Sequence, residues 1–158
     1  MLTEICQYLH NWFNRKPDGN DYPKEYGVFT IEDGVINTDI LVNGQYFRVI
    51  GSLFNDGVHK YGTDPKTDKP YDTLQDETFN GAVWSMGVPA EVVILADEIA
   101  AWQAKYGAVS SDAMSPFNSE SFAGYSYTKG SSAVSGSQGN GNGWQSVYAA
   151  RLNVWRKI

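Results

Sequence analysis

The sequence predicts an α+β protein: a small helical bundle with an inserted antiparallel β-meander and an extended C-terminal arm that ends in a short helix. Three observations lead to this fold class. Apolar residues recur at helical spacing in residues 2–13 and 89–106, strand-like runs separated by turn residues fill residues 26–86, and Gly, Ser and Asn are frequent in residues 130–143. A chain of 158 residues, 42% of them hydrophobic, is long enough to bury a core.

The first predicted helix runs from Leu2 to about Phe13. Its apolar residues recur every three or four positions, Thr3 is a candidate N-cap, and the loop signal of residues 17–21 follows. Cys6 is the only cysteine, which excludes an intrachain disulfide and a multi-cysteine zinc site. Its apolar neighbours predict that it is a small buried hydrophobic side chain.

An antiparallel meander is predicted over about residues 26–86. Asn43-Gly44 is the strongest turn signal, and a type I′ turn there requires a positive φ at both residues. Residues 55–57 mark a second turn, and the polar segment 62–71 is expected to be an exposed loop. The predicted strands cover residues 28–31, 40–42, 45–50, 53–54, 58–61 and 79–86.

The clearest helical pattern covers residues 89–106, with Pro89 where a helix can start and Gly107 as the stop. We expect its apolar stripe to pack against the first helix or a neighbouring subunit. Alternating aromatic residues predict an extended segment over residues 119–128. A short terminal helix is expected over about residues 144–156.

The predicted domain organisation has two parts. Residues 1–128 form a single α+β domain with the β-rich insertion at about residues 26–86, and residues 129–158 form a flexible Gly/Ser loop and a C-terminal docking helix. No signal peptide and no run of about 18 apolar residues is visible in the sequence. We therefore expect no membrane contact and synthesis in a reducing cytoplasm.

Charge is distributed unevenly along the chain. The whole chain has 18 acidic and 12 basic residues, a net charge of −6, which argues against a groove-binding nucleic-acid protein. Residues 1–120 hold all the acidic residues and eight basic ones, whereas residues 121–158 hold four basic residues and no acidic one. An acidic body with a basic C-terminus indicates that the two ends meet different surfaces.

Catalytic and metal-binding patterns are not evident. The two histidines, His10 and His59, have no serine-elbow motif or metal-ligand spacing around them, so both are interpreted as structural. Asp97 and Glu98 are adjacent on a helix and point about 100° apart, so they cannot face each other across a substrate bond. The sequence therefore predicts no enzyme, no catalytic or metal-ligating residues and no cofactor.

Two stretches resemble a known class of proteins. Ser-Glu-Ser-Phe-Ala-Gly-Tyr-Ser-Tyr at residues 119–127, Gly-Trp-Gln-Ser-Val at residues 143–147 and Trp-Arg-Lys-Ile at residues 155–158 look like the C-terminus of small head–tail connector (adaptor) proteins of long-tailed bacteriophages. Residues 41–56 and 74–84 look like uncharacterised phage proteins encoded near the capsid and neck genes. The β-rich region departs from the helical bundle that such connectors share.

The resemblance implies a structural protein of the virion neck that is made in the bacterial host cytoplasm. Such connectors form rings, commonly of about twelve copies, that dock below the portal protein and pass DNA through a central channel without binding it specifically. A further neck or tail protein would be the other partner. A carbohydrate- or cell-surface-binding β-rich module is the alternative of another class, and a hydrolase whose site the sequence does not reveal is a third.

The main partner contact is predicted at the C-terminus, in the segment that the resemblance assigns to portal docking. Trp, Tyr and Arg are the residue types that dominate interface energies, and a basic terminus would be attracted by an acidic groove. The competing interpretation is that this helix packs back on its own bundle. The residues assigned to the contact are Trp144, Tyr148, Arg151, Trp155, Arg156, Lys157 and Ile158.

Overall fold

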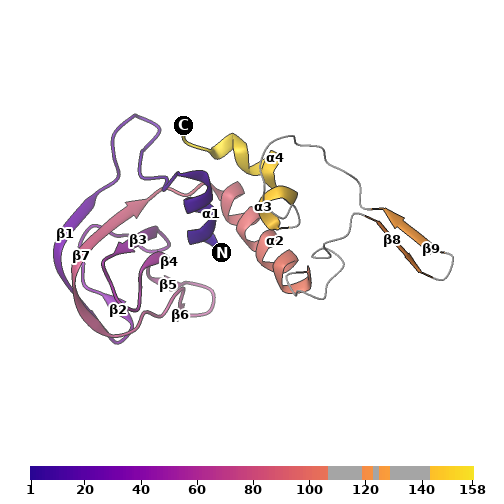
Figure 1. Cartoon of the computed structure of the whole chain (residues 1–158). Helices are drawn as coiled ribbons and strands as arrows, with labels where there is room; N and C mark the ends of the chain where they lie inside the picture. The colour runs from indigo at the N-terminus through magenta and orange to yellow at the C-terminus, as the bar shows by residue number, and fades with distance from the viewer. Residues whose placement is uncertain (107–118, 123–124, 129–142) are drawn as a thin grey trace.

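The computed structural model describes residues 1–106, 119–122, 125–128 and 143–158 (Figure 1). The helices are α1 (Leu2–Leu9), α2 (Ala90–Tyr106), α3 (Trp144–Val147), α4 (Ala149–Leu152) and the 3₁₀ turn η2 (Asn153–Trp155). The strands are β1 (Lys24–Glu32), β2 (Val35–Ile36), β3 (Tyr46–Ile50), β4 (Gly57–Lys60), β5 (Thr63–Asp64), β6 (Lys69–Pro70), β7 (Glu77–Met86), β8 (Ser119–Phe122) and β9 (Tyr125–Thr128).

The main body is a five-stranded antiparallel sheet that curls into a half-barrel (Figure 1). Its strand order is β2-β1-β7-β3-β4, so the strand that comes last in the sequence lies at the centre. β7 pairs with β1 from Lys24↔Trp84 to Ile31↔Glu77 and with β3 on its other side. The predicted meander is therefore wrong in its order, because a meander pairs each strand with the next one along the chain.

The predicted fold class, a helical bundle with a β insertion, is wrong. The chain is mostly antiparallel β, and the half-barrel encloses an apolar core of its own. Side chains alternate along β3, where Phe47 and Val49 point into the half-barrel and Arg48 points to the other face. The inner core comprises Phe29, Ile31, Ile36, Leu41, Phe47, Val49, Leu74, Phe79 and Val83.

The helices form one layer beside the sheet and share a second core with it. α1 contributes Ile5, Cys6 and Leu9, which are all fully buried, and Met86 at the end of β7 joins them. Burial raises the pKa of the Cys6 thiol to about 12, as expected for a cysteine that serves as a small hydrophobe. The C-terminal segment also belongs to this core, so it is not the extended arm that the sequence predicts.

α1 is shorter than predicted because the backbone reverses at His10. This residue has a φ of 50°, and its amide donates to the Gln7 carbonyl at 3.1 Å, which ends the helix. Thr3 is not the N-cap, which is Met1. The Thr3 hydroxyl instead accepts a hydrogen bond from the Val58 amide of β4 at 2.9 Å.

The outer edge of β4 is capped by side chains. The edge amide of Val58 donates to Thr3 as described, and the next edge amide, that of Lys60, donates to the Asp72 carboxylate at 2.6 Å. An uncapped edge strand offers a template for pairing with another chain. Both caps come from segments far from β4 in the sequence.

The other sequence-predicted elements are present in part. Residues 40–42 and 53–54 are not strands, and the predicted loop of residues 62–71 contains β5 and β6. α2 is confirmed, and so is extended structure in the described part of residues 119–128, where β8 and β9 pair antiparallel. Asn43-Gly44 does form a turn, closed by the Gln45 amide on the Val42 carbonyl at 3.0 Å. Only Gly44 has a positive φ, of 81°, which makes the turn type II and not type I′. The predicted flexible loop falls at residues 130–142, outside the described residues.

A ladder of cations and indole rings joins the sheet to the segment after α1. The Arg48 guanidinium lies 3.4 Å from the centroid of the Trp12 ring and 5.2 Å from that of Trp84. The Lys24 ammonium lies 5.0 Å from the Trp84 centroid on the next strand. Burial lowers the pKa of Arg48, and the two aromatic faces compensate for part of its lost hydration.

Candidate functional site

The C-terminal segment is held against α1 and α2 by two buried side chains. Trp144 is 6% exposed, and its ring meets that of Tyr8 edge-on at 5.5 Å. Leu152 is fully buried in the same core. Figure 1 shows α3 beside α2 and the C-terminus close to α1. These two contacts fix the segment that carries the predicted partner residues.

Backbone contacts to the loop after α1 fix the end of the segment. The Asn11 side-chain amide donates to the Trp155 carbonyl at 2.9 Å, and the Lys157 amide donates to the Leu9 carbonyl at 3.0 Å. Phe13 packs edge-on against Trp155 at 6.4 Å. Phe13 has a φ of 48°, which is unfavourable for a bulky residue, and its amide is held by the Asn11 carboxamide oxygen at 3.0 Å.

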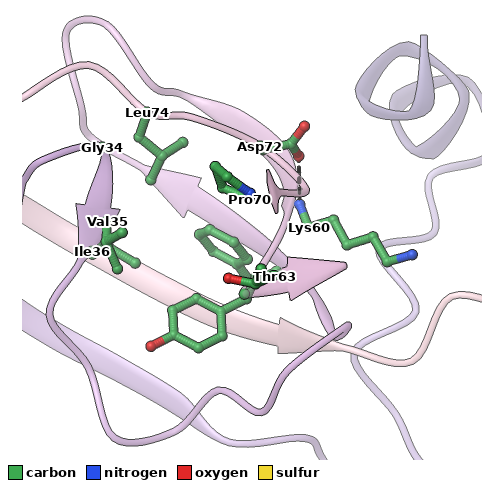
Figure 2. Close-up of a pocket in the computed structure, with 11 residues that line it drawn as sticks. Gly34, Val35, Ile36, Lys60, Thr63, Pro70, Asp72 and Leu74 are labelled. Carbon is green, nitrogen blue, oxygen red and sulfur yellow. Dashed lines mark hydrogen bonds between the residues drawn. The ribbon is translucent and has the colours of Figure 1, made fainter. Parts of the chain in front are cut away.

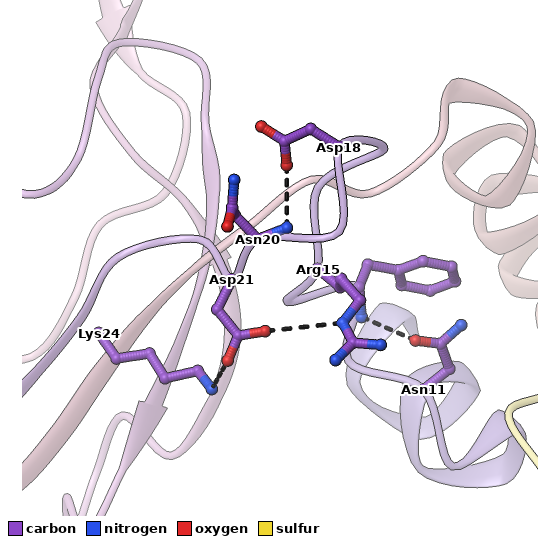
Figure 3. A network of polar contacts seen from close by, with 7 residues as sticks. Asn11, Arg15, Asp18, Asn20, Asp21 and Lys24 are labelled. Atoms are coloured by element: carbon purple, nitrogen blue, oxygen red, sulfur yellow. Dashed lines mark hydrogen bonds and ion pairs between the residues drawn. The ribbon is translucent and has the colours of Figure 1, made fainter.

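A polar network orders the same loop and places Arg15 (Figure 3). Asp21 accepts from the Lys24 ammonium at 2.8 Å and lies 3.9 Å from the Arg15 guanidinium, and the Lys24 hydrogen bond lowers the pKa of Asp21. Asp18 accepts from the Asn20 amide at 2.9 Å, which lowers the pKa of Asp18. Both carboxylates are thus stabilised in their charged forms.

Two grooves flank Val154 and Trp155. The first, of about 330 Å³, lies toward the loop after α1 and carries three cations, Arg15, Arg156 and Lys157, which we call the basic rim. The second, of about 430 Å³, lies between α2 and the C-terminal segment. We call it the apolar groove, and it is lined by Ile94, Leu95, Val154 and Trp155, with Glu91 and Arg151 at its sides.

The seven predicted partner residues therefore lie in different environments. Trp144 is in the core, and Tyr148 is half-buried with its ring 6.5 Å from that of Trp102. Arg151 forms an ion pair with Glu98 at 2.5 Å. The remaining four are Trp155, half-buried between the grooves, Arg156, over the Tyr8 ring at 4.7 Å, and the exposed Lys157 and Ile158.

Sequence reasoning missed the residues that complete these grooves. Arg15 and Ile94 come from the loop after α1 and from α2, and no local pattern connects either to the C-terminus. Val154 is adjacent to a predicted contact residue but was not assigned. The Val154 side chain is 76% exposed. The C-terminal segment is not one continuous helix, because it breaks at Tyr148 and continues as α4 and η2, so its residues do not share a single helical face.

A separate pocket of about 220 Å³ lies at the open side of the half-barrel, between β2 and the β5–β6 ribbon (Figure 2). Ile36, Phe47 and Leu74 give it an apolar floor. Figure 2 shows the Lys60 side chain extending away from the pocket, while its amide donates to Asp72. The pocket therefore offers a small apolar surface with few polar groups.

The described residues contain no group of three or more His, Cys, Asp or Glu side chains that could hold a metal ion. His10 ends α1, and a ring nitrogen of His59 lies 2.7 Å from the Asn55 carbonyl oxygen. In this part of the chain no helix has both the length and the apolarity needed to cross a bilayer.

Comparisons with known proteins identify no family for this chain. No protein-family model matches the chain, and no curated protein or solved structure is significantly similar to it.

Proposed function

We propose that the protein is a structural subunit of the neck of a long-tailed phage virion, where a ring of copies connects the portal to the tail and lets DNA pass. The observation that carries this proposal is the basic rim. It places Arg15, Arg156 and Lys157 together on a chain whose net charge is −6. The resemblance of residues 119–127 and 143–158 to phage connectors supports the same assignment.

The basic rim suits contact with an acidic protein surface. Opposite charges steer two proteins into register and raise their association rate, whereas a rim of like charge would repel the partner. Ile158 is fully exposed at the end of the chain and supplies an apolar contact beside the charges. In this proposal the portal presents the acidic surface, and a further neck or tail protein contacts another face of the ring.

Five of the seven C-terminal residues then divide between two tasks. Trp144 anchors the segment in the helical core, and Tyr148 packs beside it. Arg156, Lys157 and Ile158 are exposed and meet the partner. An acidic body suits a ring that surrounds DNA, because like charge keeps the duplex from adhering to the channel wall.

A gene-interruption experiment tests this function. A phage whose copy of this gene is interrupted is expected to yield filled heads and unattached tails in electron micrographs. The wild-type chain supplied in trans restores tailed particles. The double charge reversal Arg156→Glu with Lys157→Glu is expected to fold normally but fail to restore them, because it inverts the charge of the basic rim.

The matched control is Lys66→Glu with Lys69→Glu, which changes the same amount of charge on an exposed loop remote from the C-terminus. This control should restore tailed particles. Two results would contradict the proposal: tailed particles that form without the gene, or full rescue by the reversal at residues 156 and 157.

A carbohydrate-binding module is the second candidate, and the pocket at the open side of the half-barrel is the observation that favours it. Tyr61 lines this pocket and could stack on a sugar ring, and Thr63 and Asp72 offer polar atoms. The proposal ranks second because the pocket is small and the Lys60 ammonium points away from it. Tyr61→Ala would abolish glycan binding in calorimetry if this function were correct.

A further inference from the structure

The loop of residues 51–57, which connects β3 to the start of β4, is held in place by buried hydrogen bonds. The buried Asn55, which is 4% exposed, donates through its side-chain amide to the Gln75 carbonyl at 2.9 Å and to Glu77 at 2.7 Å. Its carboxamide oxygen accepts from the Gln75 amide at 2.8 Å. The buried Ser52 hydroxyl donates to Glu77 and accepts from the Asn55 amide at 2.7 Å. Buried hydrogen bonds therefore tie both Ser52 and Asn55 to the start of β7.

Glycines at both ends of this loop explain why the sequence folds that way. Gly51 has a φ of 87°, and a Cβ there would lie 3.1 Å from the Asn80 carbonyl oxygen of β7. Gly57 has a φ of 129°, and a Cβ there would lie 2.9 Å from the Thr3 hydroxyl. Both positions need a residue without a side chain, so the loop can lie close against β7 and α1.

The tip of this rigid loop presents two large apolar side chains to solvent. Leu53 is 81% exposed and Phe54 is 59% exposed. A single exposed apolar residue is ordinary, but two adjacent ones on a loop fixed by buried hydrogen bonds form a pre-organised contact. Binding through such a contact loses little conformational entropy, because the loop is already ordered.

The apolar groove has complementary chemistry. It is a concave site of about 430 Å³ whose exposed members, Ile94 and Val154, also lack cover in the described chain. Two apolar side chains fill such a site and remove its lining from water. Its sides carry Glu91 and Arg151, and Arg151 is paired with Glu98. The adjacent groove, which shares Val154 and Trp155, carries Arg156 and Lys157, and residues 143–158 contain no acidic residue.

Charge favours contact between the loop and the groove over contact between identical surfaces. The loop carries Asp56. Asp76 and Glu77 lie at the start of β7, just before and at its first residue, and residues 49–57 and 71–82 contain no Lys or Arg. Two such loops repel each other, as do two basic C-terminal segments, whereas a loop and a C-terminal segment attract. Contacts between two different surfaces of one chain are heterologous and generate rings when the rotation closes.

We propose that Leu53 and Phe54 of one copy insert into the apolar groove of a second copy of this chain, between α2 and the C-terminal segment. This contact would join neighbouring subunits of the ring, so it rests on the proposed function for its setting. Each subunit offers one loop and one groove. The contact therefore repeats around the assembly.

Cysteine cross-linking tests the contact with the intact chain. Leu53→Cys and Val154→Cys are made as separate variants, mixed in equal amounts and treated with a short bis-maleimide. The native Cys6 is fully buried and does not compete. We expect covalent dimers in the mixture and none from either variant alone, because a heterologous contact brings residue 53 to residue 154 and neither residue to itself.

Val28→Cys replaces Leu53→Cys as the matched control, since Val28 is an exposed apolar residue on β1. The control mixture should give no dimers.

Mass measurement by light scattering provides the second readout. Phe54→Ala is expected to weaken self-association by about 30-fold, the effect of losing one interface hot spot, and to leave the thermal melting temperature within about 2 °C.

Three outcomes would overturn this contact. They are a chain that stays monomeric at its highest soluble concentration, dimers formed by Leu53→Cys or Val154→Cys alone, and equal cross-linking in the Val28→Cys control. Failure of the proposed function is a separate result. Specific cross-linking together with normal tailed particles in the gene-interrupted phage would support the contact and refute the neck assignment.

Discussion

Replacement of Leu152 by Ala separates packing of the C-terminal segment from docking of that segment. Leu152 is fully buried in the core that α1 and α2 share with the segment. Truncation of a buried leucine to alanine costs about 2–5 kcal/mol, from the lost transfer free energy and from the cavity that remains. In a chain of this length each kcal/mol lowers the melting temperature by about 2–4 °C, so we expect a decrease of about 4–20 °C.

The matched control lies two residues further along the same segment. Val154 is 76% exposed, so Val154→Ala should change the free energy of unfolding by no more than about 0.5 kcal/mol. Urea titrations followed by circular dichroism measure both variants against the wild type. A Leu152→Ala chain as stable as the wild type, or a Val154→Ala chain as unstable as Leu152→Ala, would refute the placement of this segment in the core.

Three further predictions concern the sheet and its loops. Gly44→Val should destabilise the chain by about 1–2 kcal/mol in urea titrations, because a β-branched residue resists the φ of 81° at this turn. Asp72→Ala frees the Lys60 amide at the edge of β4, so heated samples should scatter more light than the wild type, whereas Asp72→Asn keeps an acceptor and should not. The pKa of Glu77 is lowered, chiefly by the hydrogen bond from Ser52. The stability that Glu77 contributes is therefore full above about pH 4.3, the pKa of a glutamate in the unfolded chain. It is lost as the pH falls through the lowered pKa of the folded state. Urea midpoints at about pH 6 and about pH 3 should therefore differ less in Glu77→Gln than in the wild type.

Local signals in the sequence predicted several elements correctly. The α2 pattern from Ala90 to Tyr106 has regular apolar spacing and a proline before its first turn, so its existence follows from residues close together in the chain. The Asn43-Gly44 turn was located correctly for the same reason. Its type was not, because Asn43 adopts an ordinary negative φ, and the sequence does not distinguish a type II turn from a type I′ turn.

The errors arise from contacts between distant segments. The hydrogen bond from Val58 to Thr3 spans 55 residues, and that from Asn11 to Trp155 spans 144. No periodicity in the sequence reports such pairs. The apolar spacing near the N-terminus predicts a helix that extends to Phe13, but the backbone reverses at His10 and the Phe13 ring packs against Trp155. The basic rim could not be predicted in full, because Arg15 reaches it only through this reversal.

The central position of β7 has a consequence for how the protein is made. On a ribosome the β1–β2 and β3–β4 hairpins are complete before β7 has been synthesised. The edges of β1 and β3 that pair with β7 stay unpaired until residues 77–86 emerge. The five-stranded sheet is complete only when this single strand pairs with both hairpins. Such non-local closure is slow compared with the formation of helices. A nascent chain that stalls before residue 77 would thus hold two open edges side by side, where chaperones or premature pairing between chains compete with folding.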